Sequence, residues 1–366
     1  MPIWGIPLIA LSYTEAYSEN IAVPGDGIFS FQPEVAILPH SFARFTFDAL
    51  LFNREFPEKK IRKNTMAASV DLIFNKRPST ISTVLLALFG WSRKFDAEKP
   101  FPKITAQLKR VAVEKKHLNT FNRLCGIHDS TKLPLIYPFT LIYPLLQRIL
   151  AHKKAPLTIF RTLNSRIQVL QHRRIGIDET LDLRCELVRY RIREKGLEID
   201  IASVIEAAGE PVWENTQTYY YRGKFGAADA PYEPPEFEPI PEADVVATWF
   251  LPAGTGLSFA AVSGDGNGIH YSKRYARMFG FERDFAQPLL VLAGSVERLL
   301  NADYDKAVSL DVALKGQFYY ERTIMLKKAF IKDVTRFDIY CEGNPRPCID
   351  GKLRMFEHAA GQVHLQ

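Results

Sequence analysis

The stretch Ser263-Gly264-Asp265-Gly266-Asn267-Gly268-Ile269-His270 places a carboxylate and an imidazole five residues apart. Its alternating glycines disfavour a regular helix, so the stretch is expected to form a loop. Such a loop can direct both side chains toward one water molecule. Asp265 would hold and polarise the water, and His270 would move a proton to or from it near neutral pH. Asn267, between them, is well suited to fix the turn.

The stretch resembles the motif S-G-D-x-N-P-x-H of the MaoC-like dehydratases, also called (R)-specific enoyl-CoA hydratases or hydratase 2 enzymes. The resemblance continues in Tyr275-Ala276-Arg277-Met278-Phe279-Gly280-Phe281, which looks like the family's aromatic-Ala…Gly-Phe run. The apolar stretch 288–300 then stands where the family has the central helix of a hot-dog fold. A bare D-x-N-x-x-H pattern would favour a turn with a hydrogen-bonded histidine. The flanking segments favour the family instead.

The bulk composition is that of an ordinary globular protein, with 47% hydrophobic and 24% charged residues. A length of 366 residues suggests about two domains. The cysteines have no C-x-x-C or Cys/His spacing, which argues against structural zinc and a disulfide scaffold and favours a reducing cytoplasm. They are Cys125, Cys185, Cys341 and Cys348.

The net charge of +6 suits a phosphorylated or acidic ligand such as coenzyme A or acyl carrier protein. The basic clusters at 59–63 and 115–116 lack interleaved aromatic residues, so they indicate solvated surface rather than a nucleic-acid site. Residues 1–11 are apolar, but this run is far shorter than the roughly twenty residues of a membrane span and has no preceding Lys or Arg. We therefore expect neither export nor membrane insertion.

Four segments are expected along the chain. Residues 1–100 have the least regular pattern and form an N-terminal extension of uncertain structure; a start at Met66 instead of Met1 remains open. Residues 101–223 predict a first repeat with antiparallel strands at 181–187, 197–201 and 211–221. Its helix would cover 141–150, with Pro144 kinking or starting it. Residues 224–243 form a Pro/Glu-rich linker. Residues 244–366 predict a second repeat with strands at 245–250, 309–314 and 337–341 around the helix at 288–300.

A faint internal repeat relates the halves, because Phe121-Asn122-Arg123-Leu124-Cys125-Gly126-Ile127 matches the run at 275–281 in residue type. In this register Val111 and Lys116 occupy the places of Asp265 and His270, so the first half lacks the acid-base pair. The resemblance covers residues 80–357. It implies an α+β double hot-dog fold, with two antiparallel sheets each wrapped round a central helix. The first half would then shape the acyl pocket.

By the same resemblance, Asp265 and His270 are the catalytic residues, and neither a metal nor another cofactor is needed. They would share the water that adds to a trans-2-enoyl thioester, and the reverse reaction would dehydrate an (R)-3-hydroxyacyl thioester. The predicted substrate-binding residues lie on the loop and at the start of the following helix: Ser263, Gly264, Asn267, Gln287, Pro288 and Leu289.

Two positions depart from the family's pattern. Gly268 replaces a proline and is expected to loosen the loop. Pro288 replaces the glycine whose N–H stabilises the thioester oxyanion, and proline has no N–H. The Gln287 amide or the Leu289 N–H could serve instead, the site could be decayed yet still bind thioesters, or the register could differ by one residue.

The sequence therefore predicts a cytoplasmic hydro-lyase of fatty-acid metabolism, an enoyl-CoA hydratase or 3-hydroxyacyl-thioester dehydratase. The alternatives are a catalytically weak or inactive acyl-thioester-binding hot-dog subunit, or a thioesterase. The acyl chain length, the carrier (coenzyme A or acyl carrier protein), the direction of the reaction and the assembly of two double hot-dogs into a homodimer stay open.

Overall fold

The structure is a computed structural model that describes residues 69–89, 95–128, 131–159, 162–229, 240, 242–300, 304 and 306–356. The alternative start at Met66 and most of the expected 224–243 linker lie outside these residues.

The described helices are α2 (Thr80–Phe89), α3 (Lys115–Cys125), α4 (Pro138–Ala151), α5 (Thr255–Ser263), α6 (Lys273–Met278) and α7 (Pro288–Leu299), with a 3₁₀ turn η2 (Gly268–His270). The strands of the first half are β1 (Val70–Phe74), β2 (Ile104–Val111), β3 (Leu163–Gln171), β4 (Leu181–Arg193), β5 (Gly196–Ala207) and β6 (Glu210–Arg222). Those of the second half are β7 (Asp244–Leu251), β8 (Phe285–Ala286), β9 (Ala307–Leu314), β10 (Phe318–Tyr319), β11 (Arg322–Ile331), β12 (Val334–Cys341) and β13 (Ile349–Phe356).

The expected strands follow from alternating burial. In β4, Leu181, Leu183 and Cys185 face the core while the residues between them are at least partly exposed. Short turns connect β4 to β5 and β5 to β6. The helix of the first half begins at Pro138, so Pro144 is inside α4 and does not start it.

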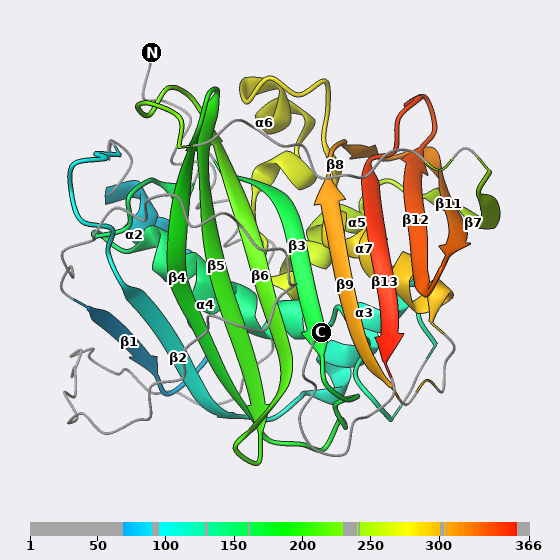
Figure 1. Cartoon of the computed structure of the whole chain (residues 1–366), viewed down its shortest axis with the longest axis horizontal. Helices are drawn as coiled ribbons and strands as arrows, with labels where there is room; N and C mark the ends of the chain where they lie inside the picture. Colours follow the sequence, from blue (N-terminus) through cyan, green and yellow to red (C-terminus); the bar gives the residue numbers. More distant parts are fainter. Residues whose placement is uncertain are drawn as a thin grey trace, which may run out of the picture. The chain divides into compact units, whose positions relative to one another are not determined.

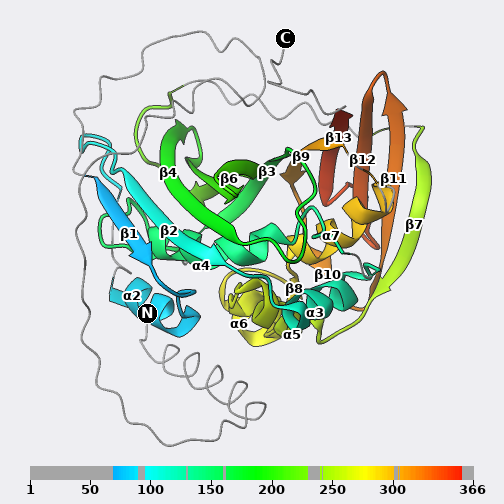
Figure 2. The same ribbon diagram turned by 90° about the horizontal axis from the view of Figure 1, so that it is seen from below.

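The main strands of the two halves have the same topology. Counted within its own half, each sheet has the order 1-3-4-5-2, which is β2-β4-β5-β6-β3 in the first half and β7-β11-β12-β13-β9 in the second. The short strands β8 and β10 pair with each other in a separate sheet. Figure 2 shows each set of strands curving around one helix, α4 in the first half and α7 in the second. This is the double hot-dog arrangement.

The two expected sheets are joined at one edge each. Strand β3 pairs antiparallel with β9, with Ile167 opposite Val312 and Val169 opposite Leu310, so the halves form one 11-stranded sheet (Figure 1). These four side chains are buried, and the apolar core therefore continues across the junction.

The segment before residue 100 adds two elements outside the repeat. Strand β1 pairs in parallel with β2 at the edge of the sheet, and α2 packs against α4. The boundaries at residues 100, 223 and 243 stay predictions.

Glycines occupy equivalent positions after α3 and α6 in the two repeats, and another glycine lies where α7 contacts the end of α3. Gly126 ends α3 with a φ of 64°, and Gly280 follows α6 with a φ of 86°, a region that suits glycine. On α7, a Cβ at Gly294 would lie 2.4 Å from the backbone oxygen of Cys125. The small side chain therefore lets α7 approach the end of α3. The next residue, Ser295, donates to the Val291 carbonyl of its own helix.

Candidate active site

The loop of residues 263–270 is held by its own polar groups. Helix α5 ends at Ser263, and Gly264 takes a φ of 81° as its C-cap. The Asp265 N–H donates to Ser263 Oγ at 3.1 Å, and the Asn267 N–H donates to Asp265 Oδ1 at 3.3 Å. Asn267 Oδ1 then accepts the N–H of Ile269 and caps η2. Asn267 thus fixes the turn, as expected from the sequence.

The loop brings the two predicted catalytic side chains together. Asp265 Oδ2 lies 3.6 Å from His270 Nε2, with the Asp265 side chain 19% and the His270 side chain 7% exposed. His270 Nδ1 lies 2.9 Å from the Phe285 carbonyl, which can only accept a hydrogen bond, so Nδ1 carries hydrogen. In the neutral ring Nε2 then offers a lone pair toward the carboxylate.

The separation of the two atoms suits a shared water. A direct hydrogen bond at 3.6 Å would be too long, and two acceptors do not hydrogen-bond to each other. A water about 2.8 Å from each atom can donate one hydrogen to Asp265 and one to His270.

The first half supplies the other side of the Asp265 environment. Burial raises the pKa of Tyr143 on α4 well above its usual value, and Asp265 raises it further. On β6, burial and then Asp265 likewise raise the pKa of Tyr219. In the loop itself the same two causes raise the pKa of Tyr271 to about 12. The phenols of these three tyrosines therefore stay protonated.

Tyr143 and Tyr219 were not identified from the sequence. They lie in the repeat that lacks the acid-base pair, and no spacing relates either residue to Asp265. A tyrosine next to the unusual interior proline Pro144 was the only local signal, and it does not indicate a catalytic contact.

The start of α7 lies next to the loop. Gln287 is the N-cap residue, and Pro288 occupies the first turn, as the ungapped register predicted. Gln287 is buried, and its Nε2 donates to the Gly256 carbonyl at 3.0 Å, so this amide is directed toward α5. Leu289 follows in the first turn, where the N–H groups of a helix have no intrahelical acceptor.

Gly268 does not leave open space in the loop. A Cβ at this position would lie 2.8 Å from the ring of Tyr275. The aromatic ring fills the volume that a larger residue would need, and the absence of a side chain permits this packing. The expected loosening of the loop is therefore opposed by the ring contact.

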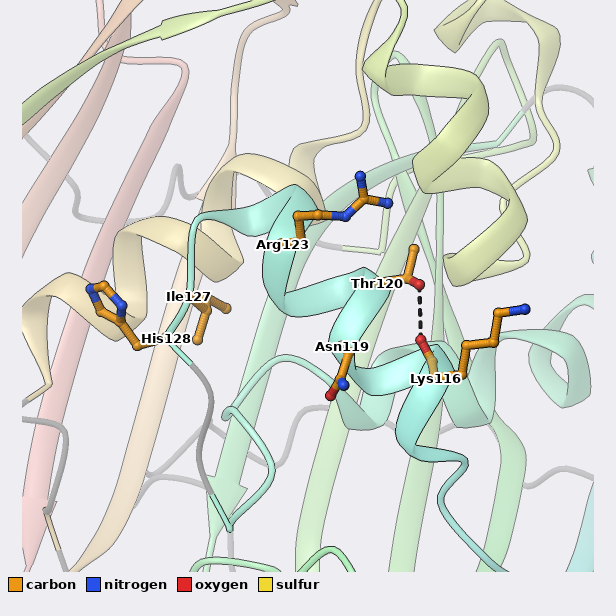
Figure 3. A pocket seen from close by; sticks show the side chains of 6 residues that line it. All are labelled: Lys116, Asn119, Thr120, Arg123, Ile127 and His128. Atoms are coloured by element: carbon orange, nitrogen blue, oxygen red, sulfur yellow. Dashed lines mark hydrogen bonds between the residues drawn. The ribbon is translucent and has the colours of Figure 1, made fainter.

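A separate open depression lies beside α3. It is lined by Lys116, Asn119, Thr120, Arg123, Ile127 and His128. Figure 3 shows Lys116 and Arg123 extending from α3, and His128 on the segment that follows the helix. None of the predicted site residues lines it.

Within the residues that the structure describes, no three His, Cys, Asp or Glu side chains come together as metal ligands. Every helix in the same part of the chain is too short or too polar to cross a bilayer.

Comparison with known proteins supports the double hot-dog fold. No family model matches the chain. The 3-hydroxyacyl-thioester dehydratase X of Mycobacterium tuberculosis is 22% identical over 236 residues, which cover 64% of this chain and 84% of that protein. The crystal structure of HtdX from Mycobacterium tuberculosis aligns with a TM-score of 0.60 and 19% identity, covering 69% of this chain and 100% of that one.

A MaoC-like dehydratase from Phytophthora capsici aligns with a TM-score of 0.58 and 15% identity, over 71% of this chain and 97% of that chain. At sequence identities of 15–19%, the solved structures establish the fold alone. The similarity in sequence is to the mycobacterial dehydratase. The chain is thus a double hot-dog relative of that 3-hydroxyacyl-thioester dehydratase and has the fold of the MaoC-like dehydratases.

Proposed function

We propose that the protein hydrates trans-2-enoyl thioesters and, in the reverse direction, dehydrates (R)-3-hydroxyacyl thioesters. The proposal rests on the 3.6 Å distance between Asp265 Oδ2 and His270 Nε2. His270 Nδ1 donates a hydrogen bond to the Phe285 carbonyl, so Nε2 is the ring nitrogen that faces Asp265. A carboxylate and an imidazole lone pair directed at one point are suited to activate a water. The name of the mycobacterial relative describes the same class of reaction.

In the proposed reaction the shared water attacks C3 of the enoyl thioester. As the new C–O bond forms, one water proton passes to the Asp265–His270 pair, and the pair returns a proton to C2. Electrons of the C2–C3 double bond move toward the thioester carbonyl and return when C2 is protonated. The water is consumed, no other co-reactant is needed, and Asp265 and His270 end in their starting states.

The oxygen of the thioester needs a donor while it carries charge. Pro288 has no N–H, and the Gln287 amide already donates to Gly256. We assign this role to the Leu289 N–H, which lies in the first turn of α7 and benefits from the positive end of the helix dipole. Ser263, Gly264 and Asn267 would line the thioester side of the loop.

The first half would form the opposite wall of the acyl pocket, since Tyr143 and Tyr219, whose pKa values Asp265 helps to raise, belong to that half. The substrate carrier would be coenzyme A or acyl carrier protein, and two double hot-dogs would associate as a homodimer. The four cysteines are buried and free of disulfides, which supports a reducing cytoplasm as the location.

Pro288 favours one second candidate, a subunit that binds acyl thioesters with little turnover. Loss of a single oxyanion donor can lower kcat by about a hundredfold to a thousandfold. In that case the loop geometry would persist as a binding feature.

The test is hydration of crotonyl-CoA and of longer trans-2-enoyl-CoA substrates, followed at the enoyl absorbance. We expect turnover by the wild type and its loss in His270→Ala and Asp265→Asn. His128→Ala, at an exposed histidine outside the loop, is the matched control and should keep the wild-type rate. Binding of the thioesters without turnover at any chain length would refute the enzyme proposal and support the binding subunit.

A further inference from the structure

The end of α5 lies immediately before the Asp265 loop. A helix leaves its last four carbonyls without intrahelical partners. At the end of α5, the Ala260 carbonyl accepts the N–H of Gly264. The Val262 carbonyl accepts side-chain donors instead, from His117 Nε2 at 2.9 Å and from Arg77 Nη2 at 3.5 Å. Both donors belong to the first half of the protein.

His117 acts as a neutral donor. Its Nε2 must carry hydrogen, because the Val262 carbonyl can only accept. Its Nδ1 therefore accepts from the Tyr137 hydroxyl, at 2.9 Å. Burial and the nearby Arg77 lower the pKa of His117, whereas the hydrogen bond to Val262 and the charge of Glu114 act in the opposite direction. The lowered pKa keeps the ring neutral, and the Val262 carbonyl fixes the tautomer.

Arg77 connects α5 to α4. Pro144 has no N–H to donate to the carbonyl four residues before it, which belongs to Thr140. Arg77 Nη2 donates to that Thr140 carbonyl at 3.2 Å and also reaches the Val262 carbonyl. Because Pro144 leaves the Thr140 carbonyl without its helical donor, this carbonyl can accept from Arg77, which also caps α5.

Gly264, the second residue of the 263–270 loop, lies beside the same groups. A Cβ at Gly264 would lie 3.5 Å from Arg77 Nη2 and 3.6 Å from Pro144 Cγ. Movement of Arg77 or of α4 would therefore change the start of the loop. Arg77 precedes α2, in the segment before residue 80 that carries no resemblance to the family.

We propose that His117 and Arg77 are positioning residues, which hold the C-terminal end of α5 so that Asp265 faces His270 in the geometry needed for turnover. The inference rests on the proposed function of the 263–270 loop. Both residues act through the α5 backbone, and a cation or N–H donor at a helix C-terminus is favourable for the dipole as well.

The test compares His117→Phe, which keeps a ring but removes the donor, with His117→Gln, whose amide can still donate to the Val262 carbonyl. A displacement of a catalytic group by about 1 Å can cost about a hundredfold in rate. We expect kcat for enoyl-thioester hydration to fall at least tenfold in His117→Phe, with KM unchanged and most of the rate kept in His117→Gln. Equal rates in all three proteins would overturn the proposal.

Arg77→Met provides a second variant, because Arg77 is exposed and its loss does not open the core. We expect the same fall in kcat at unchanged KM. Arg123→Met removes an exposed arginine of α3 and is the charge-matched control, with the wild-type rate expected. If His117→Phe does not fold, Arg77→Met decides the proposal.

The ¹⁵N resonances of the His270 imidazole report the loop independently of activity. We expect them to move in His117→Phe and Arg77→Met and to stay in place in Arg123→Met. If the wild type shows no turnover but these shifts occur, the proposed function fails and the positioning role stands. If the wild type is active and the two variants keep both its kcat and its His270 resonances, the positioning role fails and the proposed function stands.

Discussion

Replacing Tyr143 with phenylalanine tests the contribution of the first half to the active site. Tyr143 on α4 is buried, and Asp265 helps to raise the pKa of its hydroxyl. We expect this hydroxyl to hold the Asp265 carboxylate in place during turnover. A hydrogen bond to a charged group contributes about 1.5–3 kcal/mol. Since about 1.4 kcal/mol corresponds to a tenfold change in rate, Tyr143→Phe should lower kcat/KM by about tenfold to a hundredfold.

The assay is kcat/KM for hydration of a trans-2-enoyl-CoA near neutral pH, with circular dichroism to show that the variant is folded. Tyr340→Phe removes a hydroxyl that donates to Asp338, outside the loop, and is the matched control. A folded Tyr143→Phe protein with the wild-type kcat/KM would contradict this role of the first half.

Three other predictions concern the oxyanion site and the fold. Pro288→Ala restores an N–H beside that of Leu289, and kcat should rise by up to about a hundredfold in the hydration assay; an unchanged kcat would show that an N–H at position 288 does not contact the oxyanion. Burial raises the pKa of Asp338, which lies opposite Asp350, and one oxygen of each has no partner within the described ranges. Asp338→Asn should therefore raise the free energy of unfolding in urea by about 1–2 kcal/mol at pH 7, a gain that must vanish in acid, where the wild-type carboxyl is protonated. Gly294→Ala forces α7 away from α3 and should cost about 1–3 kcal/mol, more than the gain of about 1 kcal/mol in helix propensity; a raised melting temperature would contradict this close contact.

Much of the fold could be predicted because its signals are local. The alternation of apolar and polar residues at 181–187 and the apolar run at 288–300 predicted β4 and α7 correctly. The burial of a strand face or of a helix produces a hydrophobic pattern among neighbouring residues, which the sequence shows directly. The matching runs at 121–127 and 275–281 indicated the repeat, and the shared strand order is what a duplication would produce. The helix of the first half was correct in place, but its start at Pro138 was missed because an interior proline is an equally good stop signal.

The joining of the sheets had no local signal. β3 and β9 pair across the two halves, and an edge strand that gains a partner in another repeat has the same alternation as one that does not. The parallel pairing of β1 with β2 was missed for the same reason. The sequence of a short half-buried strand does not indicate whether its neighbour in the sheet is parallel or antiparallel.

The candidate site divides in the same way. That a carboxylate and an imidazole share one glycine-rich loop can be read from the residues alone, because both lie within a few residues and the turn is built from their own backbone and from Asn267. The groups that hold that loop in place depend on long-range packing. Arg77 lies 185 residues from the Val262 carbonyl that it reaches, and Tyr143, whose pKa Asp265 helps to raise, belongs to the other repeat. A hydrogen bond needs its two atoms within about 3.5 Å, and which distant segments meet at that distance depends on the packing of the whole core.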